Sequence, residues 1–508
     1  MNSLLLDRSL GNLGPNAFAR IQTTKLLSSF SPAPRFRFDD GERAAGQPSS
    51  SSASSQAQVP SHGGDTARAS VWAHQAGVSA LALERFDGRI LISGGSDATI
   101  KIWDLEQCPN PWQSHAYHPV AVIPRARTDP SAPGPGPGPS PRPSSTQGHR
   151  FGVTGLSFYP FDSAAFLSCS YDQTLKLWST ERASLSGSFD LGAKAYTHAT
   201  SPIASHLLVA CGTQHPAVRL VDLRSAAAVQ SLVSPGQIGS SAGATLAVAW
   251  SPAHEHVLAS GAVDGAVRIW DVRKANALVD LLDQEDIVGL PPTDPQTTRH
   301  PRLSAKAHDG PVNGLTWTDD GAYLVSASYD RRVRVWDAAT GANTLADFGP
   351  TIRNGQLGTL TMFVSPTGLT PPGSERLFFP NETEILVMDL HEGSMVTRLR
   401  SIGPVLASVG TQGRGERAVR NRVTSIVWRG SGGGGGGSGV VMGGSNFPGA
   451  IYSGHLDGQI RAWVPQLEGA EDEVDDNMSQ DADVVGARKR KALDDAFRSL
   501  MGKRTTFS

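Results

Sequence analysis

Three histidines stand at nearly constant distances from a serine and an aspartate, the residue types from which a base-activated nucleophile is built. They are His74, His149 and His308, and an aspartate follows each of them after 23, 23 and 22 residues. A catalytic group of this kind occurs once in a chain, whereas this one recurs. We therefore interpret the recurring group as a structural network inside a repeat.

The repeat itself is wider than the histidines, because serine precedes aspartate by four residues and aspartate precedes tryptophan by six in five places. Residues around each aspartate alternate between apolar and polar, which predicts short strands joined by a turn. A tryptophan N–H, a serine hydroxyl, a histidine ring and an aspartate can then satisfy one another in the interior. The five copies are Ser93, Asp97 and Trp103; Ser168, Asp172 and Trp178; Ser260, Asp264 and Trp270; Ser326, Asp330 and Trp336; and Ser453, Asp457 and Trp463.

This pattern resembles the WD-repeat family and implies an all-β fold, a seven-bladed propeller. Two degenerate units near residues 196–224 and 376–399 complete the seven blades. Ser241 and Val419 stand where the histidines of blades four and seven would be, which predicts lower local stability there. We expect an N-terminal helical docking segment (1–38), a Ser-rich linker (39–70), the propeller (71–467) with insertions at 124–147 and 429–446, and an acidic and basic tail (468–508).

Composition limits the functional classes. A net charge of −2 and a pI near 6.7 predict no general attraction to nucleic acid or membranes. The three cysteines are too few and too widely spaced for a disulfide framework or a zinc site. With no Cys-x-x-Cys or His-Glu-x-x-His motif, we expect no metal, no cofactor and no catalytic activity, so that function depends on surfaces. We also expect a protein without a membrane-spanning segment.

Two features add to the repeat. Arg273 follows Trp270 and Asp271 in the fourth blade, where a guanidinium can make a planar contact with several donors at an interface. Before the first blade, apolar residues are spaced to line one face of a helix after Pro15: Phe18, Ile21, Leu26 and Leu27. Such a helix packs on a partner or on its own propeller, and both alternatives stay open.

Six stretches resemble the Cockayne syndrome A family of WD-repeat proteins, in a fungal-type form. They are residues 89–106, 158–178, 196–213, 248–275, 307–345 and 452–467, and the third lies in a degenerate blade. The resemblance implies a non-catalytic receptor of a cullin-4-class RING ubiquitin ligase in transcription-coupled nucleotide excision repair. It implies that the ligase's propeller adaptor contacts Asp271, Arg273 and the helix from Phe18 to Leu27. Other surfaces would recruit repair factors and stalled RNA polymerase II.

A compact basic cluster near the C-terminus, Arg488, Lys489, Arg490 and Lys491, is typical of a nuclear localisation signal, and we expect a nuclear protein. Two rival functions remain. A direct binder of damaged DNA needs a basic face, for which Arg331, Arg332 and Arg334 are the candidates; otherwise nucleic-acid contact is at most indirect. A general scaffold for chromatin or RNA processing needs no ligase adaptor.

Overall fold

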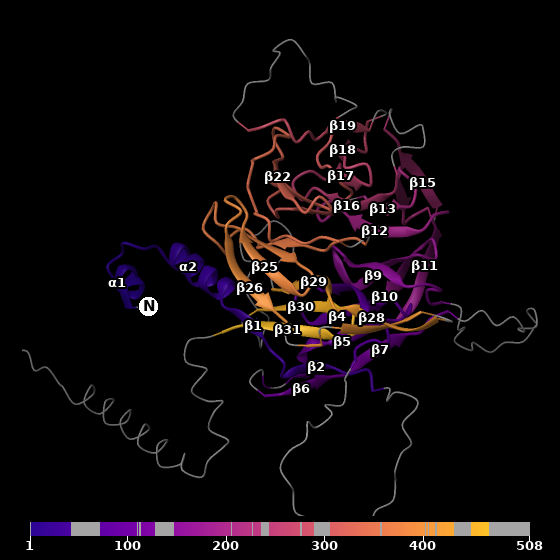
Figure 1. Cartoon of the computed structure of the whole chain (residues 1–508), viewed down its shortest axis with the longest axis horizontal. Helices are drawn as coiled ribbons and strands as arrows, with labels where there is room; N and C mark the ends of the chain where they lie inside the picture. Colours follow the sequence, from indigo (N-terminus) through magenta and orange to yellow (C-terminus); the bar gives the residue numbers. More distant parts are fainter. Residues whose placement is uncertain are drawn as a thin grey trace, which may run out of the picture. The chain divides into compact units, whose positions relative to one another are not determined.

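The computed structural model describes residues 2–41, 72–126, 147–288, 305–430 and 449–466, except for residues 109, 111, 112, 205, 226, 235–242, 275, 276, 356, 357, 402, 405, 412 and 413. Residues 1–465 form one compact unit, and the description below concerns that unit. Its sheets form a seven-bladed β-propeller, as the repeat predicts (Figure 1). In the described part of the chain, no helix is long and apolar enough to cross a membrane.

The first three blades each contain four antiparallel strands. Blade one consists of β3 (Val78–Leu83), β4 (Ile90–Gly95), β5 (Ile100–Asp104) and β7 (Pro119–Ile123). Blade two consists of β8 (Val153–Tyr159), β9 (Asp162–Ser170), β10 (Thr174–Ser179) and β11 (Ser184–Asp190). Blade three, the degenerate unit, consists of β12 (Ala195–Thr200), β13 (Leu208–Thr213), β14 (Val218–Asp222) and β15 (Ala227–Leu232).

The next three blades differ in the number of strands. Blade four consists of β16 (Thr245–Trp250), β17 (Val257–Ala262), β18 (Val267–Asp271) and β19 (Leu278–Leu281). Blade five has only β20 (Val312–Trp317), β21 (Tyr323–Ser328) and β22 (Val333–Asp337). Blade six consists of β23 (Phe363–Val364), β24 (Arg376–Pro380), β25 (Glu384–Asp389) and β26 (Met395–Arg400).

Blade seven joins the two ends of the propeller. Its inner strands are β29 (Val423–Arg429), β30 (Ala450–His455) and β31 (Ile460–Pro465), and its outer strand is β1 (Phe30–Pro32) from the N-terminal part of the chain. Phe30 pairs with Pro465 and Pro32 with Trp463 in this antiparallel ladder. The boundary expected at residue 38 therefore needs correction, because the propeller already includes Phe30–Pro32.

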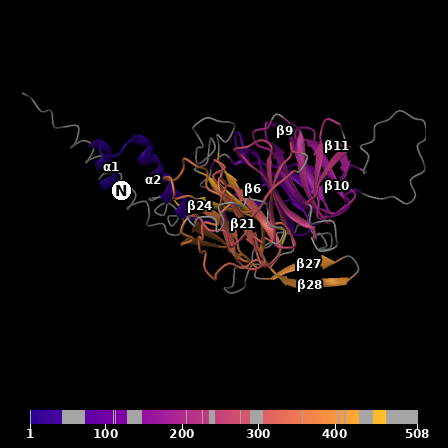
Figure 2. The ribbon, with the colours of Figure 1, turned by 90° about the horizontal axis from the view of Figure 1, so that it is seen from above.

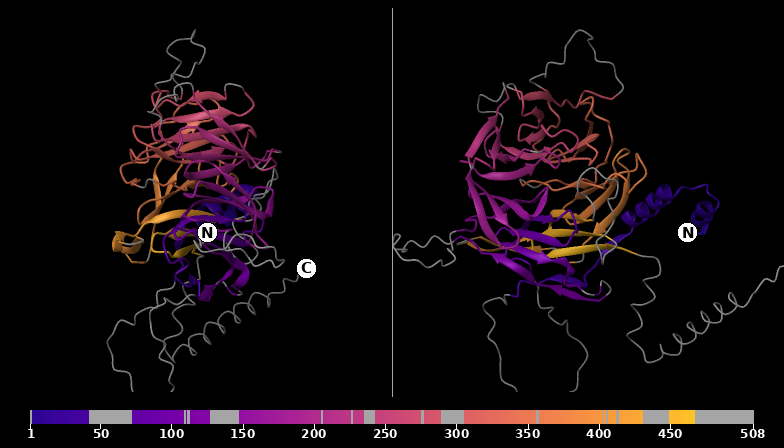
Figure 3. Two further views of the ribbon diagram at one scale, coloured as in Figure 1. Left: turned by 90° about the vertical axis from the view of Figure 1, so that its right-hand side faces the viewer. Right: turned by 180° about the vertical axis from the view of Figure 1, so that it is seen from behind.

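Smaller elements surround the blades. The helices α1 (Asn2–Ser9) and α2 (Pro15–Ser28) precede β1, and Figure 3 shows them at the margin of the propeller. A short parallel pair joins β2 (Phe36–Phe38) to β6 (His115–Tyr117), after the 3₁₀ turn η1 (Leu105–Gln107). The hairpin β27 (Leu406–Thr411) and β28 (Arg414–Arg420) projects from the propeller in Figure 2. Residues 127–146 and 431–448, within or beside the predicted insertions, lie outside the described residues.

The core lies between blades and follows from the strand pattern. Third strands such as IKIWD and VRVWD alternate side chains between the two faces of their sheet. The repeat tryptophans 103, 178, 270, 336 and 463 are all buried, with at most 1% of their surface exposed. Five large indole rings therefore fix the spacing between neighbouring sheets.

Candidate protein-docking site

Arg273 lies in the turn between β18 and β19 of blade four. Its backbone N–H donates to Asp271 Oδ1 at 3.1 Å, and its guanidinium Nε and Nη2 donate to the two carboxylate oxygens at 3.1 and 3.0 Å. These hydrogen bonds lower the pKa of Asp271 below its usual range. The side chain of Asp271 is 6% exposed and that of Arg273 is 64% exposed. A buried carboxylate thus holds an exposed guanidinium in one orientation.

The backbone of this turn is shared among the blades, whereas the arginine is not. In blades one, three, four, five and six, an aspartate that ends the third strand accepts from the N–H two residues later, a geometry that aspartate favours. The donors are Glu106, Arg224, Ala339 and His391 in blades one, three, five and six, at 2.9, 2.9, 3.1 and 3.0 Å. Among these turns, only those of blades three and four have an arginine at the position whose N–H donates. The arginine side chain, and not the backbone of the turn, therefore distinguishes these two turns from the others.

The second half of α2 packs against its own propeller. Leu27 is 1% exposed and joins a cluster with Leu369, Phe378 and Trp463, and Leu26 is half-buried against the same cluster. The Thr23 hydroxyl also donates to the carbonyl of Leu369. The expectation that Leu27 contacts an adaptor therefore needs correction, because its side chain is already buried. Leu26 and Leu27 act as anchors that position the helix.

The exposed apolar surface of the N-terminal segment lies earlier than the sequence pattern suggested. Leu5, Leu6 and Leu10 are 48%, 58% and 64% exposed, whereas Phe18 and Ile21 are half-buried. The guanidinium carbon of Arg8 lies 4.8 Å from the Phe18 ring centroid. Exposed leucines close together are typical of a protein contact. The sequence analysis did not predict this surface, although the run Leu4-Leu5-Leu6 is a signal from which it could have been found.

Strand order places α2 and Arg273 on the same side of the propeller. Third strands end, and outer strands begin, on one side of every blade, because neighbouring strands run antiparallel. Arg273 lies between the third and outer strands of blade four, and α2 leads directly into β1, the outer strand of blade seven. Blades five and six separate the two features along the ring.

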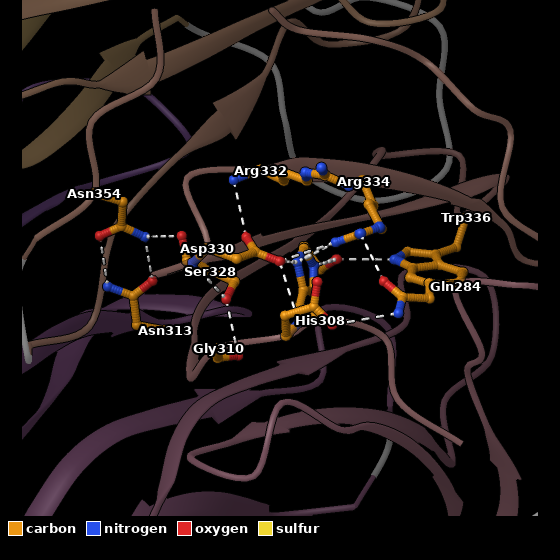
Figure 4. A network of polar contacts seen from close by, with 12 residues as sticks. Gln284, His308, Gly310, Asn313, Ser328, Asp330, Arg332, Arg334, Trp336 and Asn354 are labelled. Atoms are coloured by element: carbon orange, nitrogen blue, oxygen red, sulfur yellow. Dashed lines mark hydrogen bonds and ion pairs between the residues drawn. The ribbon is translucent and has the colours of Figure 1, made fainter. Parts of the chain in front are cut away.

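In blades one, two and five the serine, histidine, aspartate and tryptophan of the repeat meet in a buried network. In blade two, Trp178 Nε1–H donates to Ser168 Oγ at 2.7 Å, and His149 lies 2.7 Å from Ser168 and 2.9 Å from Asp172. Blade five repeats this geometry with His308, at 2.7 Å from Ser326 and 2.9 Å from Asp330, while Trp336 donates to Ser326 at 2.9 Å (Figure 4). In blade one, Trp103 and His74 both lie 2.8 Å from Ser93.

Blade one differs in how the histidine reaches its aspartate. His74 lies 2.9 Å from the Thr99 hydroxyl and 3.5 Å from Asp97. Burial raises the pKa of Asp97, but its hydrogen bonds with His74 and Thr99 outweigh burial and lower this pKa to about 2. In blades one, two and five the serine thus bonds to a histidine ring nitrogen and an indole N–H within one buried network, which stabilises the blade instead of offering a free nucleophile.

Blades four and seven complete the network by other means. Trp270 donates to Ser260 at 2.8 Å, and Asp264 pairs with Arg268 at 2.5 Å. In blade seven Trp463 donates to Ser453 at 2.8 Å, and His455 lies 2.9 Å from the same hydroxyl. His455 thus takes the role that the sequence analysis assigned to the position of Val419, whereas Ser241 lies outside the described residues. Burial raises the pKa of Asp457 despite its pairing with Arg461.

The three arginines of blade five do not form one basic face. Arg334 is 7% exposed, donates to Asp330 at 3.1 Å and donates to Gln284 at 2.8 Å. Arg331 and Arg332 are exposed. Two exposed arginines beside an internal ion pair give little support to direct binding of duplex DNA.

Comparison with known proteins identifies the repeats. The family model "WD domain, G-beta repeat" matches residues 67–104, 142–179, 236–271 and 300–337. The chain carries four WD repeats. Within the described residues, no group of three or more His, Cys, Asp or Glu side chains is arranged to hold a metal ion. WD-repeat propellers are in general non-catalytic scaffolds.

The predicted localisation residues 488–491 lie outside the residues that the structure describes.

Similar proteins carry names of different kinds. The WD propeller is 28% identical over 331 residues to "WD repeat-containing protein ATCSA-1" of Arabidopsis thaliana, covering 54% of this chain and 69% of the relative. It is 27% identical over 200 residues to "Radiation-sensitive protein 28" of Saccharomyces cerevisiae, covering 38% and 39%. It is 26% identical over 272 residues to "Ribosome biogenesis protein ytm1" of Aspergillus terreus, covering 52% and 54%.

These matches correct the identification with the Cockayne syndrome A family. Proteins named for ribosome biogenesis match at nearly the same identity as the plant and yeast proteins. The physical reason is that the serine, aspartate and tryptophan at this spacing satisfy one another inside a blade, so this part of the resemblance is common to WD propellers of different function. What the comparisons support is a WD propeller whose relatives include both the plant and yeast proteins and proteins named for ribosome biogenesis.

Proposed function

We propose that this protein is a non-catalytic substrate receptor of a cullin-RING ubiquitin ligase. The observation that carries the proposal is Arg273, whose exposed guanidinium is oriented by the buried carboxylate of Asp271. A fixed arginine at the centre of a contact is the residue type that dominates many protein interfaces. The ligase's propeller adaptor is the proposed partner.

The N-terminal helices provide the second half of the proposed contact. Leu5, Leu6 and Leu10 expose apolar surface shortly before α2, whose C-terminal end lies on the side of the propeller that also carries Arg273. Residues Phe18 and Ile21 of α2 are half-buried and lie beside this surface in sequence, so they remain candidates for its edge. An apolar patch combined with an oriented arginine provides both affinity and orientation at an interface.

The experiment compares adaptor binding by purified full-length variants in a quantitative pull-down. We expect Arg273→Ala to weaken binding at least tenfold, and the double variant Leu6→Ser/Leu10→Ser to weaken it similarly. Arg224→Ala is the matched control, because Arg224 occupies the same turn in blade three. A wild-type protein that does not bind the adaptor, or an Arg224→Ala variant that loses binding equally, would contradict the proposal.

Deletion of residues 1–38 is unsuitable for this test. It removes β1, the outer strand of blade seven, together with the buried Leu27. Loss of binding after that deletion would follow from an opened propeller as readily as from a missing contact. Point changes in exposed side chains avoid the ambiguity.

The finer proposal places the receptor in transcription-coupled nucleotide excision repair in the nucleus, with repair factors and stalled RNA polymerase II as partners of the remaining surfaces. The similarity to "ATCSA-1" and to a protein named as radiation-sensitive supports a role in repair. Sensitivity of cells to ultraviolet light after loss of the gene, rescued by wild type but not by Arg273→Ala, tests it.

A scaffold in ribosome biogenesis is the second candidate, favoured by the matches to "ytm1" and "WDR12 homolog" proteins. It predicts that the protein co-purifies with pre-ribosomal particles. It also predicts that cells carrying the Arg273→Ala variant grow as fast as cells carrying the wild type. Recovery of large-subunit assembly factors, without the ligase adaptor, would favour this candidate over the receptor.

A further inference from the structure

Within the described residues, blade five lacks the outer strand that every other blade possesses. Its third strand, β22, pairs with the strand β21 and has only an isolated bridge, from Trp336 to Asn343, on its other side, whereas β18 of blade four pairs with the strands β17 and β19. Strands that could pair but do not are usually covered or charged in soluble proteins. This exception therefore calls for an explanation.

The chain begins an outer strand and then leaves it. Asp337 N–H donates to the Ala342 carbonyl and Thr344 N–H donates to the Val335 carbonyl, which are the first bonds of a fourth strand. At Leu345 the backbone turns to φ +61°, a left-handed conformation that leucine rarely adopts, and the side chain is 56% exposed. In the described part of the chain, no further backbone bond joins residues 345–349 to β22.

The departure leaves the outer edge of β22 facing a groove. Alternate residues of a strand direct their N–H and C=O groups to opposite neighbours, so Val333 shares the outer side with Val335. A cavity of about 720 Å³ lies along this edge, lined by Val333, Arg332, Arg331, Asn343, Leu345 and Phe348 among others. The groove occupies the place of the missing strand.

The two walls of the groove have different chemistry. Arg334 lies on one face of β22 and Val333 and Val335 lie on the other, because strand side chains alternate; Arg332 directly precedes the strand. Val333 belongs to an apolar cluster with Phe348 and Ile352. Arg332 is exposed, and Arg331 beside it is exposed as well. The exposed Asp347 offsets one of these two charges and leaves the groove positive.

We propose that the groove binds an extended peptide from a partner protein as the fourth strand of blade five, and that this peptide alternates acidic and apolar residues. Its backbone pairs with the outer edge of β22, a mode in which backbone hydrogen bonds give affinity and alternating side chains give specificity. The acidic side chains lie opposite Arg332, and the apolar ones lie against Val333 and Phe348. This surface is separate from the turn that carries Arg273.

The test uses the full-length protein and a fluorescein-labelled peptide of about nine residues in which aspartate and valine alternate. Fluorescence anisotropy measures binding, and hydrogen exchange followed by mass spectrometry or NMR reports the Val333 amide. In the free protein the Val333 N–H should exchange faster than the N–H of Ile100, its counterpart in blade one, which pairs with Ile123 of the outer strand β7. Bound peptide should slow exchange at Val333 and leave Ile100 unchanged.

Two controls separate strand addition from charge attraction. The same peptide with N-methyl groups on alternate residues keeps its charge and side chains but cannot form the ladder, and it should bind at least tenfold more weakly. Arg332→Glu should weaken the unmodified peptide about tenfold, whereas Arg182→Glu, an exposed arginine in the turn after β10, should leave it unchanged. Equal binding of the methylated peptide would overturn the proposal.

The chain itself contains a competing sequence, Asp481-Ala482-Asp483-Val484-Val485. The test compares the exchange rate of the Val333 amide in the free wild type with that in the variant Asp481→Lys/Asp483→Lys. If the wild type protects the Val333 amide and the variant does not, the occupant is this segment and the assignment to a partner peptide is wrong. Fast exchange in both proteins, followed by protection on adding peptide, supports a partner.

Discussion

Blades four and five carry the same serine, aspartate and tryptophan at the same spacing, yet each completes a different part of the structure. Blade five has the full inner network through His308 but only three strands. Blade four has all four strands but no histidine in its network, and Arg268 pairs with Asp264 instead. The inner network and the outer strand are therefore independent features of a blade.

The comparison also separates structural polar groups from exposed ones. His308, Asp330 and Arg334 satisfy one another in the interior, and Figure 4 shows the adjacent Asn313 and Asn354 amides bonded to each other. Arg273 in blade four also bonds to an aspartate, but its guanidinium faces solvent. Burial, more than the identity of the residues, decides which arginine is available to a partner.

The largest expected effect comes from removing the histidine that distinguishes blade five. His308→Ala leaves the buried Ser326 hydroxyl and Asp330 carboxylate without their shared partner, and we expect a loss of about 3 kcal/mol in the free energy of unfolding. Urea denaturation measures it. His256→Ala in blade four is the control, because His256 is partly exposed and pairs with Glu255, and it should change stability by less than about 0.5 kcal/mol. Equal losses would show that the network contributes little.

A smaller difference is expected between the serines of the two blades. Ser326 bonds to both Trp336 and His308, whereas Ser260 bonds to Trp270. Ser326→Ala therefore leaves two buried groups without a partner and Ser260→Ala leaves one. We expect Ser326→Ala to cost about 1 kcal/mol more, measured by the same denaturation. A larger cost for Ser260→Ala would place the stronger network in blade four.

The pH dependence should have the same origin. Burial lowers the pKa of His308, so the folded state disfavours its proton and stability falls as the pH decreases below about 6.5. Burial raises the pKa of Asp330, but the hydrogen bond and charge of His308 outweigh burial, so the pKa is lowered. The contribution of the Asp330 carboxylate to stability is therefore lost only at more acidic pH.

Unfolding followed from pH 7.5 to pH 5 measures this effect. His308→Gln should reduce the slope by up to about 1.4 kcal/mol per pH unit, whereas changing His256 in blade four should not. An unchanged slope in His308→Gln would mean that other histidines, such as the fully buried His455, dominate the titration.

Much of the fold was predictable because the repeat is a local property. The spacing of Ser260, Asp264 and Trp270 is set by two strands and one turn, so it can be read without knowing what lies next to the blade. Seven blades followed from five such units and two weaker ones, and the structure has that number. The WD turn with Asp271 and Arg273 was predictable for the same reason.

Other features depend on contacts between distant segments, which a local pattern does not contain. The sequence did not indicate that Phe30–Pro32 would close blade seven, because its partner strand lies more than 400 residues away. The sequence placed the histidine position of blade seven at Val419, before the first inner strand of the blade. It did not indicate that His455 would bond to Ser453 instead, since only the folded sheet brings that ring to the serine.

The sequence by itself determined the propeller, the serine and tryptophan of its five repeats and the position of Arg273, because these follow from spacing within single repeats. Only the tertiary structure decided which side chains are exposed. It buried Leu27 and Arg334, left Leu6 and Leu10 on the surface, and opened the outer edge of β22. Exposure depends on which elements pack together, and packing is a property of the assembled chain.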